Sequence, residues 1–168
     1  TPAIPENPGN LNGDPESAVG SGLPATWSTI LGPSNSSPAW SATQNLPFTF
    51  MFDGLAQSQF KVSSSGVLTF DVSTSLSAPG HTNAIIPNAT IPNKSVMIWG
   101  LRGTGNNDNI VSKVFGTAPN RQLWVMFSSY SFANSGQNGY AYFSIVLEET
   151  TNHIYMVNQR HNGSMSLT

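Results

Sequence analysis

Residues 46–70 read LPFTFMFDGLAQSQFKVSSSGVLTF, and this stretch decides the fold class. Phe48, Phe50 and Phe52 occupy every second position, which places their side chains on one face of a β-strand. Asp53-Gly54 and Ser65-Gly66 then interrupt the alternation with residue pairs that tight hairpin turns prefer. The stretch therefore predicts three consecutive hairpin-linked strands, at residues 46–52, 60–63 and 67–72.

The same pattern continues toward the C-terminus. Residues 116–127 read GTAPNRQLWVMF, a strand preceded by a turn in which Pro119 fixes φ and Asn120 tolerates a left-handed conformation. No stretch of ten or more residues shows helical periodicity. Short strands with closely spaced turns predict an all-β fold, a two-sheet antiparallel β-sandwich of jelly-roll-like type. Further strands are expected at residues 27–31, 95–101, 110–115, 122–130, 140–148 and 153–158.

Two regions differ in composition. Residues 1–25 are dominated by Pro, Gly, Asn and Ser, which predicts a flexible N-terminal lead or linker. Residues 26–168 form the expected β-sandwich domain, with enough chain to bury a core without disulfides. A last strand starts near Met165 and is cut short at Thr168, so we expect the domain to continue into a longer protein.

The composition narrows the classes of function. Charged residues are 8% of the chain, far below the roughly 25% of an average domain, and the six basic residues are scattered. Without a basic stripe, nucleic acid is not an expected partner. No apolar run approaches the ~20 residues that span a membrane. The absence of cysteine excludes disulfides and thiolate chemistry, and a surface of hydroxyls and amides favours extracellular work.

Catalysis finds little support. Glu148 and Glu149 are adjacent on a strand end and so point to opposite faces. No G-x-S-x-G motif marks a serine nucleophile, and His81, His153 and His161 lack metal-ligand spacing. No cofactor is therefore expected. The alternative is a weak calcium site at residues 106–109, where Asn106, Asn107, Asp108 and Asn109 offer oxygen ligands with a single carboxylate.

Aromatic side chains are the best ligand-binding candidates, because flat rings pack on sugar faces while amides bind hydroxyls. Trp40 lies in a polar loop and is the tryptophan expected to be exposed, whereas Trp99 and Trp124 are expected in the core. Tyr130 and Tyr140 bracket an Asn- and Gly-rich turn and are expected at its rim. The complete candidate set is Trp40, Arg102, Asn106, Asp108, Tyr130 and Tyr140.

Several segments together resemble a known family. The segments LPFTF, FKVSSSGVLTF, GTAPNR and YFSIVLEETTNHIYMV resemble a β-sandwich domain of secreted and cell-surface proteins of Bacteroidetes-type bacteria, where it precedes fibronectin-like modules and a type IX secretion sorting domain. The V-S-S-x-G signature is also similar to the nidogen-like extracellular domain. Ser65 stands where an Asn is usual, and Gly100, Leu101 and Arg102 stand where acidic residues usually follow a tryptophan. The resemblance implies a secreted or bacterial outer-surface location and supplies no catalytic residues.

Three hypotheses follow from these observations. The first is a non-catalytic exported module that binds glycan or mediates adhesion, with a polysaccharide or a surface protein as partner. The second is a structural or assembly module of a larger surface protein. The third is a glycan hydrolase, which would need two carboxylates facing each other across a cleft.

Overall fold

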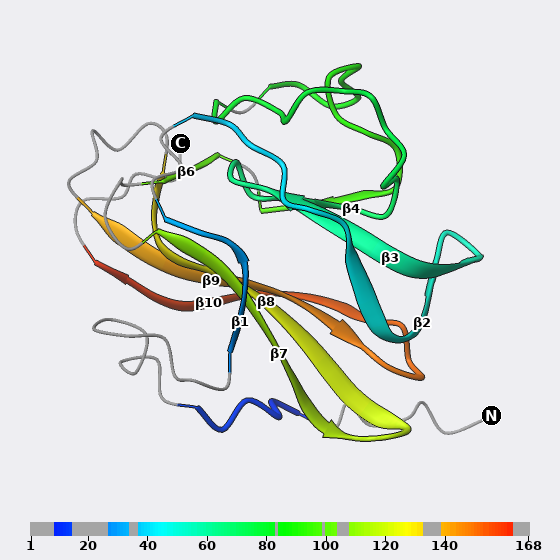
Figure 1. Ribbon diagram of the computed structural model, residues 1–168. Coiled ribbons are helices and arrows are strands. Elements are labelled where there is room, and N and C mark those ends of the chain that lie inside the picture. Colours follow the sequence, from blue (N-terminus) through cyan, green and yellow to red (C-terminus); the bar gives the residue numbers. More distant parts are fainter. Residues whose placement is uncertain are drawn as a thin grey trace.

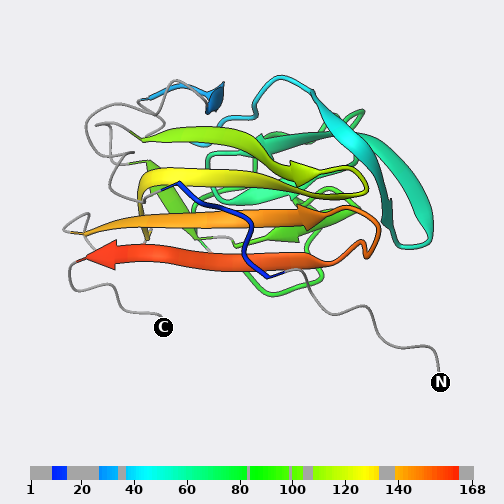
Figure 2. The same cartoon turned by 90° about the horizontal axis from the view of Figure 1, so that it is seen from below.

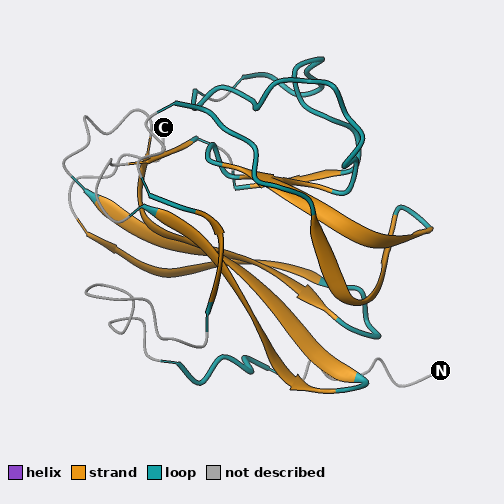
Figure 3. Ribbon diagram, viewed as in Figure 1, coloured by secondary structure: helices purple, strands orange, loops and turns teal. Residues whose placement is uncertain are grey.

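The computed structural model describes residues 9–14, 27–33, 37–82, 84–98, 100–103, 108–132 and 139–162. These residues form ten strands and connecting loops, and no helix occurs among them (Figure 3). Two antiparallel sheets pack face to face, which confirms the all-β sandwich prediction (Figure 1). The strands are β1 (Ser28–Leu31), β2 (Gln44–Phe52), β3 (Leu55–Ser63), β4 (Val67–Thr69), β5 (Ser95–Met97), β6 (Leu101–Gly103), β7 (Asn109–Thr117), β8 (Asn120–Phe132), β9 (Tyr140–Glu148) and β10 (Ile154–Asn162).

Each sheet is built mostly from strands that follow one another in the sequence. The larger sheet has the order β1-β7-β8-β9-β10, with β6 paired to β8, and the smaller sheet has the order β2-β3-β4-β5. The chain therefore begins in the larger sheet, builds the whole smaller sheet, and returns to complete the larger one. The three hairpin-linked strands predicted for residues 46–72 are confirmed as β2, β3 and β4.

Two predicted strands have different bounds in the structure. β3 begins at Leu55, five residues before its expected start, because it pairs with β2 directly after the turn. The single strand expected at residues 95–101 is two strands, β5 and β6, in different sheets. Gly100 has φ of 82°, a conformation that ends extended structure and directs the chain from one sheet to the other.

The core lies between the sheets. Phe50, Phe60 and Phe127 are its largest fully buried rings together with Tyr130. On β8 the alternation points Leu123, Val125 and Phe127 inward, and an irregularity between Phe127 and Tyr130 then brings an even-numbered residue to the same side. Ser129 has φ of 57° at this position, a left-handed conformation that one type of β-bulge uses.

The hairpin turns confirm the predicted chemistry in part. Asp53 and Gly54 have φ of 49° and 71°, which matches the type I′ turn that favours an Asp-Gly pair. The left-handed residue near the β7–β8 turn is Gly116, with φ of 85°, and not Asn120 as predicted. Only glycine fits there, because a Cβ on Gly116 would lie closer to the carbonyl oxygen of Asn120 than van der Waals contact allows.

Candidate functional site

The outer face of the larger sheet carries a second apolar cluster, separate from the core. β8 and β9 have apolar residues at both alternating positions, so Trp124 and Met126 face outward while their neighbours face the core. A sheet that is apolar on both faces requires a cover on each. The cluster contains Trp27, Val111, Trp124, Met126, Tyr142 and Val146, with Phe115, Tyr140, Tyr155 and Val157 packed against it.

A short N-terminal segment supplies part of this cover. Residues 9–14, which we call the strap, cross the outer face of β8, β9 and β10 (Figure 2). The side chain of Gln122 on β8 holds the strap, since its Oε1 accepts a bond from the Leu11 amide at 3.2 Å and its Nε2 donates to the Gly9 carbonyl at 3.0 Å. Residues 9–14 thus have hydrogen-bond partners on the sheet, and the flexible lead expected for residues 1–25 stays a prediction.

The other end of the strap is fastened by Asp14. Its Oδ2 accepts hydrogen bonds from Trp27 Nε1 at 2.8 Å and from Lys113 Nζ at 2.7 Å. The hydrogen bond from Lys113 is the main cause that lowers the pKa of Asp14; Trp27 and the charge of Lys113 add to it, and burial opposes it. Leu11, between the two ends, lies close enough to Gly116 that a Cβ there would come within 2.9 Å of its Cδ1.

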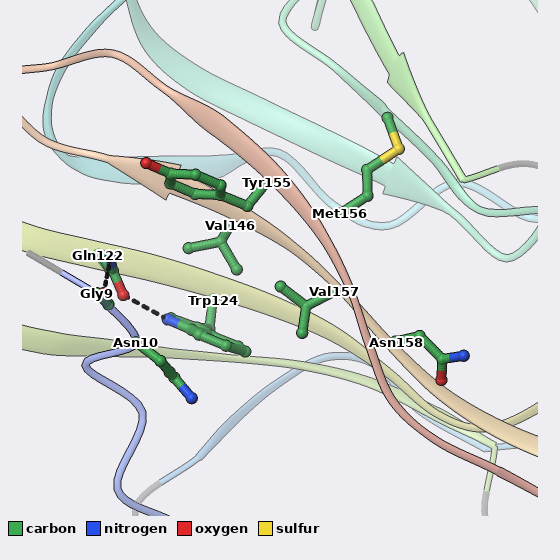
Figure 4. Close-up of a pocket in the computed structure, with 9 residues that line it drawn as sticks. All are labelled: Gly9, Asn10, Gln122, Trp124, Val146, Tyr155, Met156, Val157 and Asn158. Carbon is green, nitrogen blue, oxygen red and sulfur yellow. Dashed lines mark hydrogen bonds between the residues drawn. The ribbon is translucent and has the colours of Figure 1, made fainter. Parts of the chain in front are cut away.

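A groove of about 390 Å³ lies between the strap and β10. Figure 4 shows the Trp124 ring on its floor, with the side chain of Met156 directed to the opposite face of the sheet. Trp124 Nε1 donates to Gln122 Oε1 at 3.2 Å, which fixes the plane of the ring. The groove is mostly apolar and carries amides at its margin, and the side chains that define it are Asn10, Gln122, Trp124, Tyr155, Val157 and Asn158.

A buried carboxylate stands behind the groove. Glu148 is 1% exposed, and its oxygens accept hydrogen bonds from Gln122 Nε2 at 2.9 Å, from the Thr151 hydroxyl and from Tyr155 OH at 3.3 Å. Burial, followed by the nearby charge of Glu148, raises the pKa of Tyr155. Glu148 therefore positions Gln122 and Tyr155 and does not itself line the groove.

Glu149 lies on the opposite side of the strand, as its adjacency to Glu148 predicts. It accepts two bonds from the Arg121 guanidinium, from Nε at 2.7 Å and from Nη2 at 2.6 Å. These bonds are the main cause that lowers the pKa of Glu149. Arg121 thus binds a carboxylate and not loop carbonyls. The described residues that line the groove include no carboxylate, whereas paired-carboxylate hydrolysis needs two.

The structure changes the interpretation of two predicted site residues. Trp40 is half-buried; its Nε1 donates to the Leu76 carbonyl at 3.0 Å, and Lys61 Nζ lies 4.9 Å from its ring centre. It is therefore not the open platform that its loop position predicts. Tyr130 is fully buried, with its ring 5.6 Å from that of Phe127, so its expected place at a rim is wrong. The bulge at Ser129 is the physical reason, because it turns Tyr130 into the core.

The remaining candidates are not brought together. Arg102 is half-buried on β6, Asp108 is fully buried before β7, and Trp40 bridges to β3 of the other sheet. Asn106 lies outside the described residues. Tyr140 is on the outer face of the larger sheet, with its ring centre 5.7 Å from that of Tyr142.

The calcium hypothesis stays a prediction. Asn106 and Asn107 are outside the described residues, and Asp108 is buried. Within the described ranges no group of three or more His, Asp or Glu side chains is close enough together to hold a metal ion.

Sequence reasoning missed the groove because it assigned Trp124 to the core. Trp124 is indeed buried, at 3% exposure, but on the outer face and under the strap. The available signal was the apolar character of both alternating sets in β8 and β9, which indicates a sheet covered on both sides. A second hollow, of about 620 Å³, lies within the loop of residues 71–93 on the smaller sheet.

Comparisons with known proteins give one result. A protein-family model described as NIDO related matches residues 24–168, a range that includes all ten strands and excludes the strap. Neither a curated protein nor a solved structure matches the chain. Among the residues that the structure describes, no helical segment has the length and hydropathy of a membrane crossing.

Proposed function

Since the chain belongs to the NIDO-related family, whose membership indicates an extracellular module of adhesion type, we propose that this domain binds a glycan in the groove beside the strap. The role is non-catalytic recognition. The resemblance of the sequence to Bacteroidetes-type surface proteins adds the expectation of a bacterial outer-surface location and a type IX secretion cargo. The observation that carries the proposal is an apolar, aromatic groove edged with amides on an otherwise closed sheet.

The groove has the chemistry that sugars require. The CH face of a sugar ring packs against apolar rings, while its hydroxyls take directional hydrogen bonds from amides. Tyr155 and Val157 form the apolar wall over the Trp124 floor. At the margin, Asn10 Oδ1 accepts a bond from the Asn12 amide, which leaves the Asn10 amide nitrogen available for a ligand.

Tryptophan indole N–H signals in a protein NMR titration test this proposal. Trp124 Nε1 is bonded inside the groove and Trp40 Nε1 is bonded on the other sheet, so the second signal is a control within the same molecule. We expect a binding glycan from a panel of neutral and acidic oligosaccharides to shift the Trp124 signal and leave the Trp40 signal in place. Trp27→Phe, Trp40→Phe and Trp99→Phe variants assign three of the four indole signals, and the fourth is then that of Trp124.

Two outcomes would contradict the proposal. A glycan that shifts only the Trp40 signal would place binding on the smaller sheet. A panel with no bound glycan, measured with folded protein, would remove the glycan-binding role.

An assembly role is the second candidate, favoured by one observation. Ile85 is 88% exposed and its neighbour Ile86 is 59% exposed, so two large aliphatic side chains stand together on the loop over the smaller sheet. Adjacent exposed aliphatic residues mark protein contacts more often than isolated ones do. Sedimentation velocity over a range of concentrations tests self-association. A sedimenting mass that rises with concentration in the wild type, but not in the Ile85→Ser/Ile86→Ser double variant, would support assembly. A constant monomer mass of the wild type would contradict it.

A further inference from the structure

Arg160 on β10 is an exposed cation that pairs with no carboxylate in the described part of the chain. Its guanidinium carbon lies 5.5 Å from the centre of the Tyr140 ring, on the same outer face as the groove. The other charged groups of this face have partners, since Lys113 binds Asp14 and Glu148 accepts bonds from neutral side chains. Arg160 therefore has its hydrogen-bond donors available to a ligand.

The strand register places Arg160 in line with the groove. On β10, Tyr155 pairs with Val146 of β9, and Arg160 pairs with Tyr142. Val146 and Tyr142 are four residues apart on β9, which corresponds to about 13 Å along an extended strand. The register shift between Asn158 and Arg160 adds one residue, so Arg160 reaches the same face as Tyr155 in spite of its even number.

Polar side chains continue the path between the groove and Arg160. On β9, the Ser144 hydroxyl is hydrogen-bonded to the Gln159 side chain. A ligand that leaves the apolar groove along β10 therefore passes over the hydrogen-bonded Ser144–Gln159 pair before it reaches the guanidinium.

We propose that this face binds an acidic oligosaccharide, with neutral sugar in the groove and a carboxylate or sulfate group at Arg160. This inference rests on the glycan-binding function proposed above. The planar fork of an arginine matches a carboxylate or sulfate in a two-bond geometry, and stacking on Tyr140 holds the fork in place before binding. A monosaccharide is too short to occupy both positions. The net charge of −2 gives the whole chain no general attraction for an anion, so binding of an acidic group requires a local cation such as Arg160.

Isothermal titration calorimetry with three tetrasaccharides tests the inference. Unsulfated chondroitin carries carboxylates alone, chondroitin sulfate adds sulfate esters, and chitotetraose is neutral. We expect at least one acidic tetrasaccharide to bind the wild type about 5- to 10-fold more tightly than chitotetraose, the effect of one charge-assisted hydrogen-bonded contact. Arg160→Gln should abolish this preference without changing the binding of chitotetraose. Binding of the unsulfated tetrasaccharide assigns the carboxylate, and binding of the sulfated one alone assigns the sulfate.

The matched control is Lys94→Gln, which removes one exposed positive charge beside the smaller sheet. An equal loss of affinity in Lys94→Gln and Arg160→Gln would overturn the inference, because it would indicate general electrostatic attraction. Equal binding of the neutral and acidic tetrasaccharides by the wild type would also overturn it, while the glycan-binding function would stand. If none of the three binds, the inference fails; the glycan-binding function fails as well only if no glycan of the wider panel shifts the Trp124 indole signal.

Discussion

The two outer faces of the sandwich are covered by different kinds of contact. On the larger sheet the strap crosses the outer face of the strands (Figure 2). An apolar cluster lies on this face, and a groove remains beside the strap. On the smaller sheet the loop of residues 71–93 arches over β4 (Figure 1), and hydrogen bonds from polar side chains hold its ends.

The cover of the smaller sheet depends on specific polar partners. Lys61 Nζ donates to the carbonyls of Val72 and Thr74 at 3.4 and 3.3 Å, and Trp40 Nε1 donates to that of Leu76. Thr69 Oγ1 donates to the Asn93 carbonyl at 3.1 Å. These bonds are directional, so a shift of the loop would leave polar groups of Lys61, Thr69 or Trp40 without their partners.

On the larger sheet the surface under the cover is apolar, and the polar bonds of Gln122 and Asp14 fasten the strap only near its two ends. Area has no direction, so a narrow strap stabilises the rings it touches and leaves the adjacent apolar surface open to another occupant. The comparison explains why the groove lies on the face that is apolar, and why the Trp40 indole is bonded to the loop over the smaller sheet. Four predictions test this contrast.

The largest effect is expected from Trp124→Ala. Removal of this buried ring leaves a cavity under the strap and should lower the free energy of unfolding by about 3–5 kcal/mol. Trp40→Ala, which removes the half-buried tryptophan beside the smaller sheet, should lower the free energy of unfolding clearly less. Urea denaturation of both variants measures the difference, and equal losses would mean that the two faces are not distinguished by apolar burial.

Gln122→Leu should release the strap. The Leu11 amide and the Gly9 carbonyl lose their partner, and the buried Glu148 loses a donor, for a combined cost of about 2–3 kcal/mol. Hydrogen exchange of the Leu11 amide should accelerate strongly. Gln59→Leu, at an exposed position of the smaller sheet, is the control and should leave that exchange rate unchanged. Unaltered protection of Leu11 in the Gln122 variant would show that other contacts hold the strap.

Thr69→Val should destabilise the cover of the smaller sheet without a change in volume. It removes the bond to the Asn93 carbonyl and the bond from the Asp71 amide, at a cost of about 1–2 kcal/mol. Thr49→Val, at an exposed position of β2, should be close to neutral. Thermal unfolding of the two variants measures the loss of stability. A neutral Thr69→Val would indicate that packing, and not directed hydrogen bonds, holds the loop.

The smallest effect concerns the pH dependence of the strap. The folded-state pKa of Asp14 is lowered, so its contribution to stability is present above the ordinary pKa of about 4 and disappears as the pH falls through the lowered value. The Lys113 partner is partly exposed, which limits the contribution to less than about 1 kcal/mol. The pKa of Glu149 is lowered as well, so Glu149 also contributes stability that is lost at low pH. The difference in the free energy of unfolding between the wild type and Asp14→Asn, measured from pH 5 to 2.5, therefore isolates the effect of Asp14. A difference that stays constant over this pH range would exclude a stabilising ion pair between Asp14 and Lys113.

The alternation of residues predicted the strands well, because it reflects local geometry. Phe48, Phe50 and Phe52 face the core as expected. The single-residue shift at Ser129 could not be predicted, since a bulge depends on how two distant strands pair, and it moved Tyr130 from a predicted rim into the core. The candidate site was missed for a similar reason, because burial of Trp124 does not say which face of the sheet carries it.

The sequence by itself determined the class of fold, the β2–β3–β4 hairpins and the opposite orientation of Glu148 and Glu149. These features follow from the period-two geometry of a strand and from turn residues that act over a few positions. Only the tertiary structure decided that the strap docks on the outer face, because Gln122 and Leu11 are 111 residues apart and their hydrogen bond exists only after the sheet has formed. The groove, and the position of Arg160 over the Tyr140 ring on the same face, result from that long-range packing.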